Sequence, residues 1–243
     1  MNRELITAVD KAEITVIVDN YTDWLLIEGT EVVKRPVVPP GKTLLAEHGL
    51  SLLVTVSVGN ERHTVIMDAG VSAIPVIQNA ESLGIDLALV EGILISHGHI
   101  DHFGGLPELL KHVPERTVLK AHPAAFRERR INIAPMDIIT DLPALEKTAI
   151  EEAGIHLDLN PGVSTLADGM IMCLGEVERT TDFEKGFPWA EVKVDDRWMQ
   201  DDFPDDQGMA IRQKLSIESR YCEPVSQIRL LNPRPLKKFR GQI

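Results

Sequence analysis

Alternating and continuous runs of apolar residues along the chain predict a series of β-strands. Residues 13–20 (EITVIVDN) alternate and are rich in β-branched side chains, which is typical of a half-buried strand. Two apolar runs, 50–58 and 62–67, flank a short polar connection at Asn60-Glu61, and this arrangement predicts a β-hairpin. The apolar run at 87–95 predicts a buried strand. Shorter strands are expected at 117–121, 163–166 and 170–174.

Helical spacing of apolar residues occurs between these strands. It predicts a helix at 76–83, stopped by Gly84, and an amphipathic helix at 142–153. Another helix is expected at 107–112, with its proline in the first turn. The basic segment 122–130 predicts a helix or turn. Because strands and helices interleave, the pattern indicates an α/β class, and the N-terminal hairpin makes the sheet mixed.

Three histidines and one aspartate fall within six residues after the 87–95 strand, in the segment SHGHIDHFGG (residues 96–105). If the segment is extended, His97, His99 and Asp101 share a face, whereas His102 is one step out of phase where the chain turns into a helix. His97 and His99 would then serve one metal position, and Asp101 and His102 a neighbouring one. Imidazole with carboxylate favours zinc and also suits manganese or iron. The alternative is a solvated, histidine-rich loop.

A divalent ion at this segment would lower the pKa of a water molecule to roughly 7 and polarise a carbonyl or phosphoryl oxygen. Metal-dependent hydrolysis is therefore the expected reaction, with Asp101 as the catalytic residue that orients the water or takes its proton. Two interpretations stay open for Asp68, which ends the 62–67 strand. Its carboxylate either accepts a hydrogen bond from the ring nitrogen of a ligand histidine that does not bind the metal, or only belongs to a turn at the end of the strand.

Composition and charge narrow the class of protein. The 243 residues, 44% of them hydrophobic, suffice for one large domain, and a net charge of −12 argues against a nucleic-acid binder. No apolar run reaches transmembrane length and the N-terminus is unlike a signal peptide, so we expect a cytoplasmic protein with a small-molecule substrate and no membrane partner. Cys173 and Cys222 are expected to be reduced thiols.

The charge balance changes after Asp205-Asp206-Gln207. Residues 208–243 hold eight basic and two acidic residues, a net charge of +6, whereas residues 1–207 carry −18. Residues 208–243 also contain no histidine and no long apolar strand. We therefore expect a domain at 1–207 and a basic, atypical tail at 208–243.

The metal segment, preceded by Met67-Asp68-Ala69-Gly70, resembles the metallo-β-lactamase superfamily. Within this superfamily, the chain most resembles the branch of metal-dependent hydrolase-like proteins that are related to dihydropterin-linked ribofuranosylaminobenzene phosphate synthase. The resemblance covers about residues 13–207. The stretches that carry the branch are Val18-Asp19-Asn20, Ala46-Glu47-His48-Gly49-Leu50, Ala121-His122-Pro123 with Phe126-Arg127, and the segment from Gly175-Glu176 through Arg179 to Glu184.

The resemblance implies an αββα sandwich with a dinuclear site, usually zinc, at one edge of the sheets. His97, His99, Asp101 and His102 would be its ligands. It also implies that the substrate pocket includes Asn20, His48, Glu176 and Arg179. Each of these residues has a plainer interpretation, such as a strand-end turn residue for Asn20 or a solvated side chain for Arg179.

The resemblance further implies downstream ligands, in a Gly-Cys-x-His-type motif and a later histidine, that residues 208–243 lack. The expected sandwich is therefore incomplete in its second half, its C-terminal part truncated or replaced. Such a fold would have an unpaired strand edge that a second copy of the chain could pair with, so homo-oligomerisation is a further expectation. Three hypotheses follow: a metal-dependent hydrolase or synthase-like enzyme acting on a small, phosphorylated or pterin-like substrate; a catalytically impaired remnant with a partial metal site; and a metal- or partner-binding module.

Overall fold

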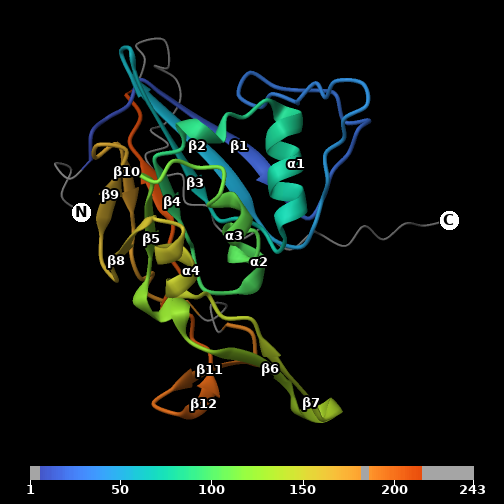
Figure 1. Cartoon of the computed structure of the whole chain (residues 1–243), viewed down its shortest axis with the longest axis vertical. Helices are drawn as coiled ribbons and strands as arrows, with labels where there is room; N and C mark the ends of the chain where they lie inside the picture. The colour runs from blue at the N-terminus through green and yellow to red at the C-terminus, as the bar shows by residue number, and fades with distance from the viewer. Residues whose placement is uncertain (1–5, 182–185, 215–243) are drawn as a thin grey trace.

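A mixed six-stranded sheet forms the centre of the fold in the computed structural model, which describes residues 6–181 and 186–214 (Figure 1). Its order is β1-β2-β3-β4-β5-β8. The first three strands are antiparallel, and β3, β4, β5 and β8 run parallel. The strands are β1 (Lys11–Val18), β2 (Ser51–Val58), β3 (Glu61–Met67), β4 (Gly92–Leu94), β5 (Val118–Ala121) and β8 (His156–Leu159). The predicted hairpin and mixed sheet are confirmed.

The helices contribute to a core on one face of this sheet. They are α1 (Ala73–Leu83), α2 (Ile100–Phe103), α3 (Leu106–Leu109) and α4 (Lys147–Glu152), with the 3-10 turns η2 (Leu87–Leu89), η3 (Pro123–Phe126) and η4 (Ala134–Met136). Val76 of α1 and Leu106 of α3 join Ile66 and Ile93 of the sheet in the first hydrophobic core. The predicted helix stop is confirmed, since Gly84 ends α1 at φ 68°.

A three-stranded sheet, β13-β10-β9, contributes to a second core on the opposite face. Its strands are β9 (Ser164–Leu166), β10 (Ile171–Cys173) and β13 (Met209–Ile211). Successive residues of β2 enter different cores, Leu53 the first and Val54 the second. Burial on both faces explains why the predicted strands are continuous apolar runs. No helix in 6–181 or 186–214 contributes to the second core, so the described layers form the αββ part of the expected αββα sandwich.

A smaller four-stranded sheet, β12-β11-β6-β7, extends from one end of the sandwich (Figure 1). Its strands are β6 (Arg129–Ile133), β7 (Ile138–Leu142), β11 (Ala190–Val194) and β12 (Arg197–Gln200). One expectation is wrong here. The helix expected at 142–153 is confined to α4, because Leu142 completes β7. The helix or turn expected at 122–130 is present as the short 3-10 turn η3, and β6 begins at Arg129.

The expected C-terminal tail is described only over its first residues. Met209–Ile211 pair with β10 as β13, and the backbone of residues 212 and 214 bonds to Val9. The remainder, 215–243, which includes Cys222, lies outside the described residues, so the division at 207 remains a prediction. No helix in 6–181 or 186–214 is long and apolar enough to cross a membrane.

Cys173 provides a test of the second core. The residue is buried in β10, and burial raises the pKa of its thiol to about 11. Because the thiolate is the reactive form, a Cys222→Ser variant should react with a thiol-specific disulfide reagent at pH 8 at least about 100-fold more slowly when native than in guanidinium chloride. Rapid labelling of the native variant would contradict the packing of β10.

Candidate metal centre

The histidine-rich segment lies at the carboxyl ends of three parallel strands. Asp68 follows β3, the histidine loop (Ser96 to His102) follows β4, and His122 follows β5. Parallel strands bring their carboxyl ends to one edge of a sheet, where crevices for ligands form. Backbone bonds hold the edge together, from Asp68 N to Leu94 O at 2.9 Å and from Ile95 N to Lys120 O at 3.0 Å.

The three imidazoles of the loop are neighbours. The ring of His97 lies 4.9 Å from that of His99 and 4.1 Å from that of His102, between centroids. Asp101 Oδ2 is 3.4 Å from His102 Nε2 and 3.4 Å from the Nε2 of His48, whose side chain is 85% exposed. The four predicted ligands and His48 therefore lie together at this edge.

The expected backbone of the loop is partly wrong. His99 is extended, at φ −95° and ψ 144°, but helix α2 already begins at Ile100. Asp101 consequently belongs to the first helical turn, where an acidic side chain faces free backbone N–H groups, and not to an extended segment with His97 and His99. The turn brings Asp101 beside His102, and the two remain predicted ligands of a common position.

Asp68 is fully buried and binds the loop through both carboxylate oxygens. Its Oδ2 accepts hydrogen bonds from His102 Nδ1 and Ser96 Oγ, each at 2.7 Å, and its Oδ1 accepts one from Ser96 N at 2.7 Å. With Nδ1 donating to Asp68, the Nε2 atom of His102 faces Asp101. The contact has the form that a carboxylate behind a metal-binding histidine takes.

Buried Arg129 ties the loop to distant parts of the chain. Its side chain is 2% exposed; Nε donates to Asp201 Oδ2 and Nη2 to Asp205 Oδ2, each at 2.8 Å. Asp205 Oδ2 also accepts from Gly98 N at 2.7 Å, and Arg129 Nη1 donates to Gly98 O at 3.1 Å. A Cβ on Gly98 would lie 2.0 Å from Ala125 O, so only glycine fits there. The network holds both backbone polar groups of Gly98.

The segment that supplies these aspartates covers the loop. Gln207 donates from its backbone N to Ser96 O at 3.0 Å and from Nε2 to Ile95 O at 3.1 Å. The ring of Phe203 lies 4.9 Å from that of His99. Sequence reasoning did not identify Arg129, Asp201 or Phe203 as part of the site, and it used Asp205-Asp206-Gln207 only as a landmark. The acidic run at 201–206 was a visible signal.

The predicted substrate residues differ in how close they lie to the histidine loop. Arg179 lies close, because its guanidinium is 5.2 Å from the Phe203 ring and donates to Asp206 at 3.3 Å. Asn20 and Glu176 are exposed, and among the described residues neither side chain bonds to the loop. Asn20 is nevertheless adjacent to the segment that carries His48, since Asp19 O accepts a bond from Glu47 N.

Burial and the neighbouring carboxylates determine the protonation of the loop. Burial lowers the pKa values of His97 and His99, so both imidazoles are neutral at pH 7. Burial opposes ionisation of Asp101, but its hydrogen bond with His102 outweighs this and leaves the pKa well below its usual range. Burial also opposes protonation of His102, yet the Asp101 and Asp68 carboxylates raise its pKa to about 10.

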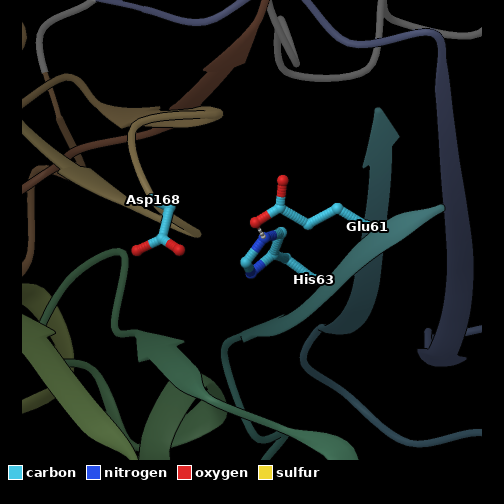
Figure 2. Close-up of side chains that lie close together, drawn as sticks. All are labelled: Glu61, His63 and Asp168. Carbon is cyan, nitrogen blue, oxygen red and sulfur yellow. Dashed lines mark ion pairs between the residues drawn. The ribbon is translucent and has the colours of Figure 1, made fainter. Parts of the chain in front are cut away.

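This donor set suits a divalent ion of the zinc type, because neutral imidazoles and an ionised carboxylate are its usual ligands. His102 would release its proton on metal binding. A second group of possible metal ligands lies apart from the histidine loop. Among the described residues, one ligand atom each of Glu61, His63 and Asp168 lies within 4.8 Å of the other two (Figure 2).

Comparison with known proteins identifies relatives. Residues 46–172, just over half of the chain, match the family model of the metallo-beta-lactamase superfamily. The 7,8-dihydropterin-6-methyl-4-(beta-D-ribofuranosyl)-aminobenzene-5'-phosphate synthase of Methanocaldococcus jannaschii is 29% identical over 169 residues, which is 68% of this chain and 57% of that protein. The hydroxyacylglutathione hydrolase of Aliivibrio salmonicida is 38% identical over 60 residues, 25% of this chain and 22% of that enzyme.

A solved structure shows the same fold. Tm1679, described as a metal-dependent hydrolase of the beta-lactamase superfamily, matches with a TM-score of 0.54 at 21% identity, over 82% of this chain and 60% of that one. The chain thus spans less than two thirds of each of these three relatives.

The Arg129 network generates a prediction about stability. Arg129→Met removes the cation and leaves the buried carboxylates of Asp201 and Asp205 without it, so the free energy of unfolding should fall by about 3–5 kcal/mol in urea denaturation followed by circular dichroism. Arg130→Met is the matched control. Arg130 is more exposed and pairs with Glu191, so its loss should cost about 1 kcal/mol or less. Equal losses in the two variants would contradict the role of Arg129.

Proposed function

Because the chain belongs to the metallo-β-lactamase superfamily, we propose that it is a metal-dependent hydrolase whose metal is held by the histidine loop. The observation that carries the proposal is the gathering of three imidazoles and the Asp101 carboxylate at the carboxyl ends of parallel strands. The superfamily typically binds divalent metals, and within it we propose zinc, with manganese or iron as alternatives.

The residues that would hold the metal are His97, His99, Asp101 and His102. When bound, such an ion would lower the pKa of water to about 7 and polarise a carbonyl or phosphoryl oxygen. Asp68 would act behind His102 by fixing which ring nitrogen carries the proton, since its Oδ2 accepts from Nδ1. Asp101 would orient the attacking water or accept its proton, because its carboxylate is partly exposed and lies 3.4 Å from the exposed His48 imidazole.

A small, phosphorylated or pterin-like molecule is the substrate class that we propose. The printed name of the Methanocaldococcus relative contains both a phosphate and a dihydropterin, which supports this class. Arg179 lies beside Phe203, whose ring in turn contacts that of His99, and its side chain is partly exposed, so it is the candidate to bind a substrate phosphate, with His48, Asn20 and Glu176 as further pocket residues. The net charge of −12 also favours a small molecule over a nucleic acid as the substrate. We propose a cytoplasmic location for the protein.

Hydrolysis of chromogenic substrates tests the proposal. Protein supplied with zinc or manganese should hydrolyse bis(p-nitrophenyl) phosphate or p-nitrophenyl acetate, and His99→Ala should reduce the rate to background because a predicted ligand is lost. The matched control is His112→Ala, since His112 is a surface histidine on Glu108 and its loss should leave the rate unchanged.

The wild-type result decides between the hypotheses. A folded protein that binds metal at the loop but hydrolyses neither substrate would contradict the hydrolase hypothesis. It would favour the hypotheses of a binding module or an impaired remnant. Activity that survives His99→Ala in full would exclude the loop as its source.

A further inference from the structure

We propose a second divalent-metal site, built from Glu61, His63 and Asp168, at the opposite end of β3 from the histidine loop. Strand β3 begins at Glu61 and ends at Met67, directly before Asp68. Seven residues of strand span about 20 Å, so the two ends of β3 serve separate sites. No part of the proposed hydrolase mechanism uses Glu61, His63 or Asp168.

His63 is the side chain that points to a ligand. The residue is 9% exposed, and its Nδ1 lies 2.6 Å from Glu91 Oε1. A carboxylate accepts, so Nδ1 carries the proton in this contact. Burial opposes protonation of Nε2, but the Glu61 and Glu91 carboxylates outweigh it and raise the pKa of His63, so a metal ion at Nε2 would displace a proton. Nε2 is buried and makes no hydrogen bond of normal geometry among the described residues, and its near neighbour is the Glu61 carboxylate. An imidazole held at Nδ1 by a carboxylate, with Nε2 directed at further ligand groups, is the arrangement that metal-binding histidines adopt.

Two carboxylates lie close to the His63 ring. Glu61 Oε1 is 3.2 Å from His63 Nε2, and one ligand atom each of Glu61, His63 and Asp168 lies within 4.8 Å of the other two. Tetrahedral zinc with bonds of about 2.1 Å holds its ligand atoms about 3.4 Å apart, so the Glu61–His63 spacing already fits. The Asp168 oxygen, within 4.8 Å of the others, would have to move closer by about 1.4 Å at most. Figure 2 shows Asp168 facing the imidazole from the turn opposite β3.

The site would connect two layers of the sandwich. Glu61 and His63 belong to β3 of the large sheet, whereas Asp168 lies in the turn between β9 and β10 of the three-stranded sheet. Two carboxylates and an imidazole favour a transition metal of the zinc type over magnesium or calcium, which take oxygen ligands alone. The proposed role is therefore structural: the ion would clamp the turn onto the strand and stabilise the packing of the two sheets.

Asp168→Asn is the variant that tests the site. Asp168 has a φ of 48°, and asparagine tolerates this region, so the turn should keep its conformation. The matched control is Asp137→Asn, which changes the same charge at another exposed turn residue with a φ of 52°. After zinc loading and gel filtration, elemental analysis should find one zinc ion per chain fewer in Asp168→Asn than in the wild type, and no change in Asp137→Asn.

Two further measurements make the test independent of the histidine loop. Glu91→Gln should weaken zinc binding at this site about 10- to 100-fold, because Glu91 orients the His63 ring. A His97→Ala/His99→Ala double variant should still gain thermal stability on adding zinc, and Asp168→Asn in that background should abolish the gain. Unchanged zinc content in Asp168→Asn would overturn the proposal and leave an ordinary ion pair between His63 and Glu61.

Discussion

The buried ion pairs of Arg129 hold the histidine loop where the site needs it. Gly98 sits between the first two histidines, and both of its backbone polar groups are bound by side chains, its N–H by Asp205 and its C=O by Arg129. These partners come from β6 and from the segment after β12, far along the chain. Since a buried charge is costly unless it is paired, Arg129 and its two aspartates must be in place together. The position of the loop therefore depends on the whole chain up to Gln207.

The parallel part of the large sheet determines which residues meet. Polar residues follow strands β3 and β4, and the parallel pairing of the two strands brings Asp68 into contact with the histidine loop. The same strand β3 begins at Glu61, so the opposite edge gathers a different set of polar side chains. The large sheet lies between two cores, of which the helices contribute to the first and the three-stranded sheet to the second. The two ends of β3 thus lie beside two different groups of polar side chains.

Much of the fold was predictable from local pattern. The strands β2, β3 and β4 are apolar runs because both of their faces are buried, and the histidine loop combines a dense motif with a strand before it and a helix after it. The hairpins β6–β7 and β11–β12 were not predicted, since β7 and β12 are largely exposed and have no buried apolar face. The expected helix at 142–153 failed at its start, where Leu142 pairs with Arg129 in β6.

Long-range contacts explain what the sequence could not show of the sites. Arg129 read as one basic residue among several, and only the fold reveals that it neutralises Asp201 and Asp205. His63 and Asp168 are similarly far apart in the chain, and a histidine two residues after a glutamate is too common to indicate a metal. The motif and the family resemblance predicted the residues that do lie near the loop. Of the residues that they predicted, the exposed Asn20 and Glu176 have the fewest contacts with the loop.

Anomalous diffraction at the zinc absorption edge tests the central claim most directly, because it locates the metal without assuming any reaction. For crystals of the full chain grown with zinc, the account predicts an anomalous peak among the imidazoles of His97, His99 and His102, beside Asp101. Zinc peaks elsewhere on the protein, with none at the loop, would contradict the claim that these residues form a metal centre.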